Sequence, residues 1–466
     1  MDTLFGSGFQ GKSPNITAQR RVNCYYEYNQ DGDKTRVSII GTPGLVLFKD
    51  VGDTTIRGMY APHWNSNLYF VHRSTLYEVN NAGVSTSLGT LDTSSGRVAF
   101  SDNGTEIMLV DGTYGYIYNT GTLAFAKIAD ADFPANPNTV CFDSSRFLVN
   151  AGGTGRFYGS DGYSGTAWNA LNYATAESIP DDLVRIEAMK GLIVLFGDYS
   201  IEYWANAGLP GFPYSRVSAA NQDFGLAARW SVSTLAGTLA FLAKTREGQV
   251  IVARLNGYQV EPISTPELDY VINNFASVAD ATAFSYMLGG HPMYQINFPA
   301  AGYSFLYDAS TGVWSDLKSE GLNRHRADLG INYLNKTYVG DYSVGKIYKI
   351  EQDTYTEDGG VLRMELVSRH LFNEGKLQRI TSFQVDGEMG VGLVTGQGSD
   401  PQVMLTISKD GGHTFGTEMW STLGKVGAYM TRARWRNLGA ARDWVFKLVV
   451  TDPVKRVITG VYINQP

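Results

Sequence analysis

The chain carries a recurrence of short β-like runs. Its units begin near Ile56, Arg97, Thr139, Val184, Val232, Ala281 and Ala327. Successive starts lie 41 to 49 residues apart, which is room for four strands of about five residues and their turns. A period of this length built from short strands is typical of propeller blades. We therefore predict a β-propeller, with seven blades favoured by the seven starts and six or eight as alternatives.

Length and composition favour an all-β protein with more than one domain. The chain has 466 residues, which is more than a single hydrophobic core usually contains. Its 52 glycines suit turns, and its 12% aromatic residues suit half-buried strands. After about Gly360 the runs become longer and alternate, with Val403, Leu405 and Ile407 on one face. This pattern predicts a C-terminal β-sandwich. The predicted divisions are an N-terminal arm with a closing strand (1–50), the propeller (51–360) and the sandwich (361–466).

Two single elements complete the predicted fold. The run Leu45–Phe48 precedes the first unit and is placed to pair with the last one. Such pairing would close the ring and remove two exposed sheet edges. A helical period of apolar residues predicts one helix over Pro266–Phe275, crossing between two units.

Charge and composition argue against several functional classes. The net charge is −7 and no run of five basic residues occurs, so we do not expect a protein that grips nucleic acid by its phosphates. No apolar stretch of about 18 residues predicts a membrane span, and the N-terminus lacks the features of a signal peptide. Cys24 and Cys141 have no paired spacing and are expected to be reduced thiols.

Three motifs resemble functional loops, and each has a simpler interpretation. Residues 6–13 match the P-loop pattern, but only five residues precede them and no helical period follows, so we expect a flexible glycine-rich arm. Asn29, Asp31 and Asp33 begin like a calcium loop that lacks its required Gly and Glu, which favours a hairpin turn. The segment 408–415 resembles the Asp-box turn of sialidases, and a lone structural hairpin is expected there.

No catalytic, metal-binding or cofactor-binding residues are predicted. The six histidines lack metal-ligand or protease spacing, and His325 lies between two arginines in a setting more typical of a solvated loop. The most basic short stretch is 431–436, where alternation places the arginines on one face of a strand. A solvated face and a docking surface for an acidic partner both remain open. The candidate protein-contact residues are Phe5, Phe9, Arg432, Arg434, Trp435 and Arg436.

The N-terminal region resembles a known family. Residues 18–27 (AQRRVNCYYE) and 41–48 (GTPGLVLF) are similar to the opening of the packaged-DNA stabilisation proteins of P22-like short-tailed phages. Further similarity lies in Leu192–Trp204, in 306–310 (LYDAS) and in the Ser408-x-Asp410-Gly411 turn. Cys24 stands where that family usually has Leu. The resemblance spans nearly the whole chain.

The resemblance implies a non-enzymatic structural protein of the virion tail. It implies a tail hub ring, expected to be a hexamer, below the portal and its adaptor. A needle or plug protein and tailspikes or fibres are the implied neighbours. The ring would retain packaged DNA and form part of the ejection channel without binding a DNA sequence. The alternatives are a glycan-binding or glycan-degrading tail propeller, and a propeller scaffold of cellular origin.

Overall fold

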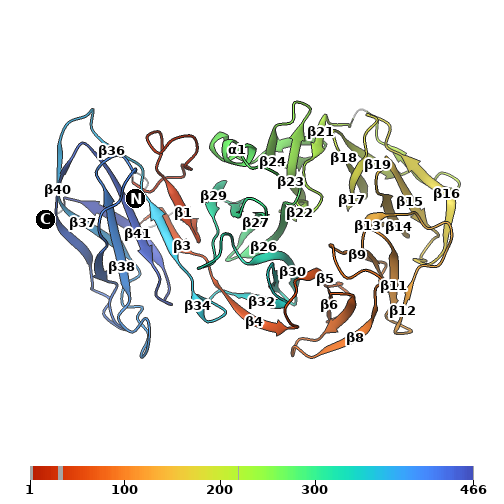
Figure 1. The fold of residues 1–466 in the computed structure, drawn as a ribbon, viewed down its shortest axis with the longest axis horizontal. Coiled ribbons are helices and arrows are strands. Elements are labelled where there is room, and N and C mark those ends of the chain that lie inside the picture. Colours follow the sequence, from red (N-terminus) through yellow and green to blue (C-terminus); the bar gives the residue numbers. More distant parts are fainter. Residues whose placement is uncertain (1–3, 30–34, 219, 465–466) are drawn as a thin grey trace.

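The computed structural model describes residues 4–29, 35–218 and 220–464. Within these ranges the protein is almost entirely β, with one α-helix. Figure 1 shows two bodies: a ring of small sheets on the right and a two-layered body on the left. The predicted all-β class, with a propeller followed by a C-terminal sandwich, is confirmed.

The propeller strands in the described residues form seven successive antiparallel sheets. Sheets 1 to 4 consist of β5 (Ile56–Tyr60), β6 (Leu68–His72), β7 (Thr75–Val79), β8 (Ser85–Thr90); β9 (Ala99–Asp102), β10 (Glu106–Val110), β11 (Gly115–Asn119), β12 (Ala124–Lys127); β13 (Pro137–Asp143), β14 (Arg146–Ala151), β15 (Arg156–Ser160), β16 (Trp168–Thr175); and β17 (Leu183–Met189), β18 (Leu192–Gly197), β19 (Ile201–Asn206), β20 (Tyr214–Arg216).

Sheets 5 to 7 consist of β21 (Phe224–Leu226), β22 (Ser233–Leu235), β23 (Thr238–Thr245), β24 (Val250–Asn256), β25 (Gln259–Pro262); β26 (Thr282–Leu288), β27 (His291–Phe298), β28 (Tyr303–Asp308), β29 (Val313–Asp316); and β30 (Ala327–Tyr333), β31 (Lys336–Asp341), β32 (Lys346–Glu351) with β4 (Gly44–Asp50). The innermost strands β5, β9, β13, β17, β22, β26 and β30 all line one axial cavity and begin within two residues of the predicted starts. These sheets support a count of seven blades, which stays a prediction.

The ring closes through the N-terminal strand β4. It pairs antiparallel with β32, with Leu45 opposite Ile350 and Leu47 opposite Tyr348, as the sequence predicted for this run. A hydrophobic cluster then joins the seventh sheet to the first, with Ile347 packing in the same core as Phe70. Strands from the two ends of the propeller therefore complete one sheet, which leaves no open edge at the join.

The helix α1 (Pro266–Asn273) lies between the fifth and sixth sheets in chain order, as predicted. Thr265 caps its N-terminus, accepting a hydrogen bond from the Leu268 amide at 3.4 Å. Leu268 and Ile272 are buried in the core shared by these two sheets. The helix thus covers the apolar space at the crossing between them.

The sandwich consists of two sheets whose core lies between them. One sheet contains β1 (Arg20–Val22), β35 (Met364–Val367), β41 (Asp443–Val450), β38 (Gln402–Ser408) and β39 (Met419–Thr422), with β36 (Leu371–Phe372) beside β41; the other contains β2 (Cys24–Tyr28), β3 (Val37–Gly41), β42 (Val457–Ile463), β37 (Gln378–Gly387) and β40 (Ala433–Ala441). Phe383 stacks on Phe446 across the layers, with ring centroids 4.6 Å apart. The alternation predicted that Val403, Leu405 and Ile407 share one face of their strand, and the structure packs all three against this core.

Within the described part of the first fifty residues, strands β1 to β4 all pair with strands from later in the chain or with one another. Strand β1 pairs with β29 of the propeller on one side and with β35 of the sandwich on the other, so one continuous sheet crosses both bodies. Strands β2 and β3 belong to the second sandwich sheet. The predicted ranges 1–50, 51–360 and 361–466 follow the order of the chain, whereas tertiary pairing assigns β1 to β3 to the sandwich. Two short strands, β33 (Thr356–Glu357) and β34 (Gly360–Val361), extend the closing sheet from β4.

Candidate functional site

The seam between propeller and sandwich concentrates buried polar groups, and Arg21 lies at its centre. Its side chain is 2% exposed and donates to the carbonyls of Gly6 (2.7 Å), Gly8 (2.9 Å) and Trp314 (2.7 Å). Trp314 belongs to propeller strand β29, whereas Arg21 itself lies in β1. One guanidinium therefore holds the N-terminal segment and the propeller together, and its five donors suit this role.

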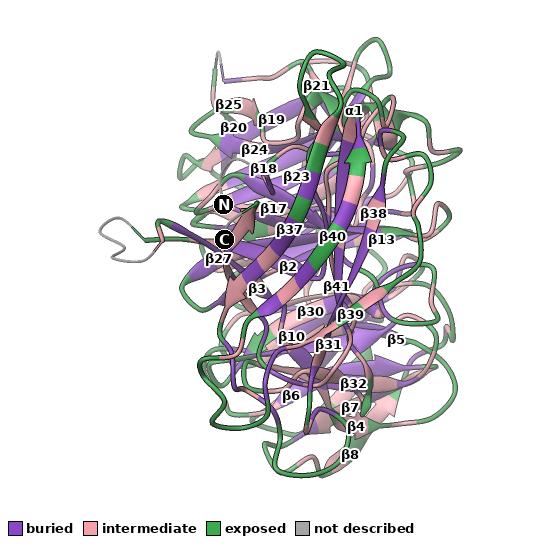
Figure 2. Cartoon of the chain, turned by 90° about the vertical axis from the view of Figure 1, so that its left-hand side faces the viewer, coloured by how far each residue is buried: buried purple, intermediate pink, exposed green. Residues whose placement is uncertain are grey.

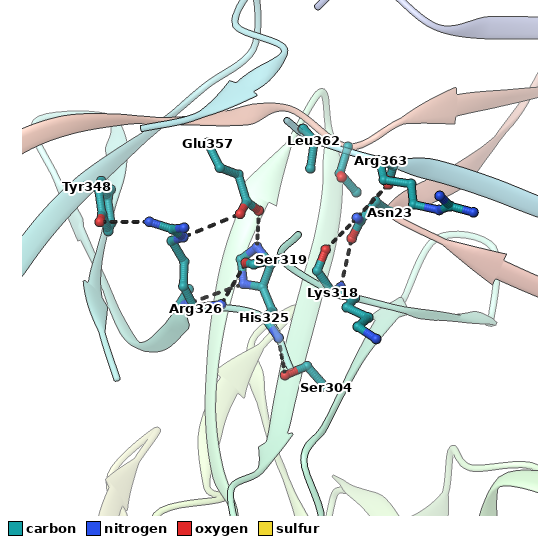
Figure 3. Close-up of polar contacts among 12 residues, drawn as sticks. Asn23, Ser304, Lys318, Ser319, His325, Arg326, Tyr348, Glu357, Leu362 and Arg363 are labelled. Atoms are coloured by element: carbon teal, nitrogen blue, oxygen red, sulfur yellow. Dashed lines mark hydrogen bonds and ion pairs between the residues drawn. The ribbon is translucent and has the colours of Figure 1, made fainter. Parts of the chain in front are cut away.

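Asn23 makes a second link across the seam, shown in Figure 3. Its Nδ2 donates to the carbonyls of Lys318 and Arg363, both at 2.7 Å, and its Oδ1 accepts from the Lys318 amide at 2.9 Å. Its φ of 54° is left-handed, a conformation that Asn tolerates better than most residues. Since Lys318 follows the propeller strand β29 and Arg363 precedes the sandwich strand β35, the side chain bridges both domains.

A buried ionic cluster lies beside these links, around Glu357 (Figure 3). Its carboxylate lies 3.3 Å from Nε2 of His325 and 3.4 Å from Nε of Arg326. Arg326 also donates to the Tyr348 hydroxyl at 3.0 Å. Burial alone would raise the pKa of Glu357, but the hydrogen bond and charge of His325 hold it below its ordinary value, with Arg326 contributing. The cluster ties β33 to the loop before β30 and to β32.

The structure corrects the prediction for His325. The sequence placed it in a solvated loop, but it is 9% exposed and faces Glu357. Its Nδ1 also lies 3.2 Å from Nε2 of Gln295. The two arginines beside it do not have to face solvent, because each has an acidic partner: Arg326 pairs with Glu357 and Arg324 pairs with Asp328. His325 can therefore be buried between them.

A second buried histidine, His291, joins the propeller strand β27 to the sandwich strand β2. Its Nδ1 lies 2.8 Å from Asp308 and its Nε2 lies 2.9 Å from Glu27. Burial alone would lower the pKa of His291, but the hydrogen bond to Glu27 and the charge of Asp308 raise it above the ordinary value. The neighbouring Tyr25 ring packs edge-on at 5.4 Å, and burial raises its pKa to about 12, so it stays neutral.

We expect His291 to make the stability of the protein depend on pH. A group whose pKa is raised by folding contributes stability that is complete below its unfolded pKa, about 6.5 for His, and is lost as pH rises through the folded value. The variant His291→Gln should therefore be less stable than wild type near pH 6, by on the order of 1 kcal/mol. The difference should shrink toward pH 9, as measured by thermal unfolding at stepped pH.

The matched control is His63→Gln, since His63 is exposed. Its unfolding curve should follow wild type across the whole pH range. A His291→Gln protein whose deficit stays constant or grows with pH would contradict the assignment.

The candidate contact residues fall into two groups. Phe5 (3% exposed) lies in the sandwich core and Phe9 (7%) packs on Phe305 of the propeller. Trp435 is also buried, and its Nε1 donates to the Met419 carbonyl at 3.0 Å. These three aromatic side chains therefore stabilise this chain rather than lying on its surface.

The arginines of the same stretch lie at the outer edge of the sandwich. Arg432 and Arg436 are exposed and Arg434 is half-buried, while Ala433 and Trp435 point inward. Figure 2 shows this alternation of exposed and buried residues along β40, next to β37. Since β40 is the last strand of its sheet, the predicted one-sided arginine face is present there. Whether it contacts a partner stays a prediction.

The three loop motifs have structural roles where they are described. No helix follows residues 6–13, and the Gly8 amide donates to Gln19 Oε1 at 2.9 Å, so it does not face a phosphate. In the turn at 408–415, Asp410 accepts hydrogen bonds from Ser408 (2.6 Å) and from the Thr414 hydroxyl (2.6 Å), which lower its pKa. That confirms a structural hairpin. Asp31 and Asp33 lie outside the described residues, although the flanking strands β2 and β3 pair as a hairpin.

The described residues contain no group of three His, Cys, Asp or Glu side chains arranged to hold a metal ion. Cys24 and Cys141 are both free and buried, and burial raises the pKa of Cys24 to about 12. Among these same residues no helix is long and apolar enough to cross a membrane.

Sequence reasoning missed the polar residues that link the domains. Arg21 and Asn23 lie within the run 18–27, which was singled out only for its family resemblance. Asn23 lies between Val22 and the apolar and aromatic run Cys24–Tyr26, which is a signal that could have marked it, because a polar residue there needs buried partners. Arg21 follows Arg20 and carries no such signal.

Comparisons with known proteins agree with this architecture. Residues 13–355 match the family model described as "Bacteriophage P22 Gp10, beta-propeller", and residues 363–465 match the model described as "Bacteriophage P22 Gp10, beta-sandwich". Among curated proteins, the chain is 24% identical over 304 residues to "Tail hub protein gp10" of Salmonella phage P22, covering 62% of this chain and 61% of that protein. The chain therefore spans about three-fifths of that relative's length.

Solved structures give weaker likenesses. The WD40 domain of Neurospora crassa Pan2 matches with a TM-score of 0.45 at 8% identity, covering 67% of this chain and 97% of that one. An extracellular domain of a two-component system from B. thetaiotaomicron matches with a TM-score of 0.46 at 8% identity, covering 74% and 43%. Neither likeness bears on function.

Proposed function

The chain belongs to the bacteriophage P22 Gp10 family, and we propose that it is a structural tail hub protein of a short-tailed phage virion. The observation that carries this proposal is the match of both family models, propeller and sandwich, in order along the chain. The similarity to a tail hub protein supports it. The tail of the virion is the location that follows.

We further propose that the protein assembles as a ring, most simply a hexamer, below the portal and its adaptor, with a needle or plug protein and tailspikes or fibres as neighbours. The ring would retain packaged DNA and form part of the ejection channel. The axial cavity of the propeller holds about 240 Å³, too little for duplex DNA, so the DNA would pass through the centre of the ring of subunits rather than through one propeller. A net charge of −7 limits trapping of the phosphates as DNA moves.

The junction between the two domains supports this structural role. The sheet shared through β1, together with the links made by Arg21, Asn23 and His291, joins propeller and sandwich in one body. A ring that resists the pressure of packaged DNA requires subunits whose domains do not swing. In such a ring, the face with Arg432, Arg434 and Arg436 is a candidate contact for an acidic neighbour.

Genome retention tests the proposal. Phage particles assembled without this protein should fill with DNA and then lose it, because the exit channel is left unsealed. The measurement is the nuclease-protected DNA per particle, followed over time after packaging. Supplying the wild-type protein in trans should restore retention and infectivity, and this is the control. Particles that keep their genome and infect without the protein would refute the proposed function.

A further inference from the structure

A group of arginines gathers at one end of the axial cavity. Arg57 and Arg185 lie at the starts of β5 and β17, and Arg97, Arg229 and Arg324 precede the axial strands of their own sheets. Axial strands of a propeller run in one direction, so their first residues meet at one end of the axis. Arg57, Arg97 and Arg185 line the cavity of about 240 Å³, together with Trp230.

Arg57 has a purely structural role in this group. Its guanidinium donates to the carbonyls of Gly96, Arg73, Thr93 and Ser95 and to the Thr93 hydroxyl. Its donors are thereby fully used. The remaining four arginines are the ones to consider for a ligand.

These four arginines outnumber the carboxylates that face them. Asp328 pairs with both Arg97 and Arg324, and Glu187 pairs with Arg185. Four cations against two anions leave an excess of two positive charges beside a small cavity. Since burial strengthens such repulsion, the arrangement is costly unless an anion compensates it.

Several of their hydrogen-bond donors have no acceptor within the described part of the chain. Arg324 is 5% exposed, and its buried Nη1 has no partner there. Arg229 is half-buried and donates through Nε to the Val184 carbonyl at 3.1 Å; its two Nη atoms hold no bond among these residues but, unlike Nη1 of Arg324, are not buried. Buried donors without acceptors are rare in native proteins and often mark a missing ion or water.

Trp230 fixes the geometry of the cluster. Arg97 and Arg185 both lie over its ring, at 6.0 and 5.7 Å from the centroid. Burial lowers the pKa of Arg97, and although Asp328 opposes this, the charges of Arg324 and Arg185 lower it further. Burial and the charge of Arg185 likewise lower the pKa of Arg229. The like charges are thus held close together by the fold.

We propose that this arginine cluster binds a small oxyanion of the phosphate type at the end of the axial cavity. Guanidinium groups are suited to phosphate because their planar donors match its oxygens. The cavity accommodates an ion of a few heavy atoms and excludes duplex DNA. This site is independent of the proposed tail hub function, since it rests only on residues of the propeller axis.

Calorimetric titration of the full chain with inorganic phosphate tests the site. At constant ionic strength in chloride we expect saturable binding of one phosphate per chain. Arg97→Met should weaken binding at least about tenfold, because one charge-assisted contact is lost while Asp328 keeps Arg324 as its partner. If that variant fails to fold, Arg229→Met carries the same expectation, since its Nη atoms hold nothing in the described structure.

The matched control is Arg254→Met, because Arg254 pairs with Glu261 on the outer strands of the fifth sheet, away from the axis. It should bind phosphate as wild type does. Absence of saturable binding to wild type, or equal affinity in the axial variants, would overturn the site. So would binding of a short oligothymidylate without binding of free phosphate, since that result would assign the arginines to a nucleic-acid strand instead.

Discussion

The variant Glu357→Leu should lose about 3–5 kcal/mol of unfolding free energy, because it removes the buried carboxylate that faces His325 and Arg326. The side chain of Glu357 is only 2% exposed, so water cannot replace it. The guanidinium of Arg326 keeps the Tyr348 hydroxyl and the more distant carboxylate of Asp341, at 3.7 Å. His325 instead loses the carboxylate that it faces. The measurement is the midpoint of urea unfolding, monitored by tryptophan fluorescence.

The control for this variant is Glu351→Leu. Glu351 pairs with Lys336 and Lys349 but is about one-third exposed, and surface pairs contribute roughly 0–1 kcal/mol. Equal losses in the two variants would show that the buried cluster has no special weight in stability.

The same cluster predicts a dependence on acid. Because the pKa of Glu357 is lowered on folding, its contribution is present above the unfolded value of 4.5 and is lost as pH falls through the folded value. The gap in stability between wild type and Glu357→Leu should therefore narrow below about pH 4.5. A gap that widens with acid would contradict the direction of the shift.

The variant Gly44→Ala should open the propeller at its closing strand. A Cβ at this position would lie 2.1 Å from the Thr356 carbonyl oxygen and 2.8 Å from the Thr356 amide nitrogen, both backbone atoms. Strand β4 would have to shift away from β33, which also disturbs its pairing with β32. We expect a loss of about 3 kcal/mol, as for a strongly overpacked site, and faster hydrogen exchange across residues 346–351.

Gly121→Ala is the matched control for this second variant. There the new Cβ would meet only Asn119 Oδ1, at 3.4 Å, in an exposed turn. It should exchange hydrogens at wild-type rates throughout the seventh sheet. If Gly44→Ala left exchange in β32 unchanged, closure would not depend on the close approach of β4 and Thr356.

Local patterns predicted the elements whose partners follow from simple geometry. The sequence predicted a helix over Pro266–Phe275, which the structure has at Pro266–Asn273. It also predicted the shared face of Val403, Leu405 and Ile407 and the closing strand at Leu45–Phe48. The helix and the strand face follow from the periodicity of a few neighbouring residues. The closing strand follows from the repeat, because the last unit needs a partner at its open edge. The burial of His325 could not be predicted from local patterns, because its acidic partner Glu357 lies 32 residues away.

The sequence by itself determined the class of the fold, because the repeat of short strands and the change after Gly360 are local properties of the chain. It also indicated the family, because each of the motifs at 18–27 and 41–48 is a contiguous run of residues. Only tertiary structure decided which sheets strands β1 to β3 belong to. Phe5 is buried in the sandwich and Phe9 in the propeller, and β1 joins these two domains in one sheet. Those contacts join segments hundreds of residues apart, and burial is a property of such packing rather than of residue type.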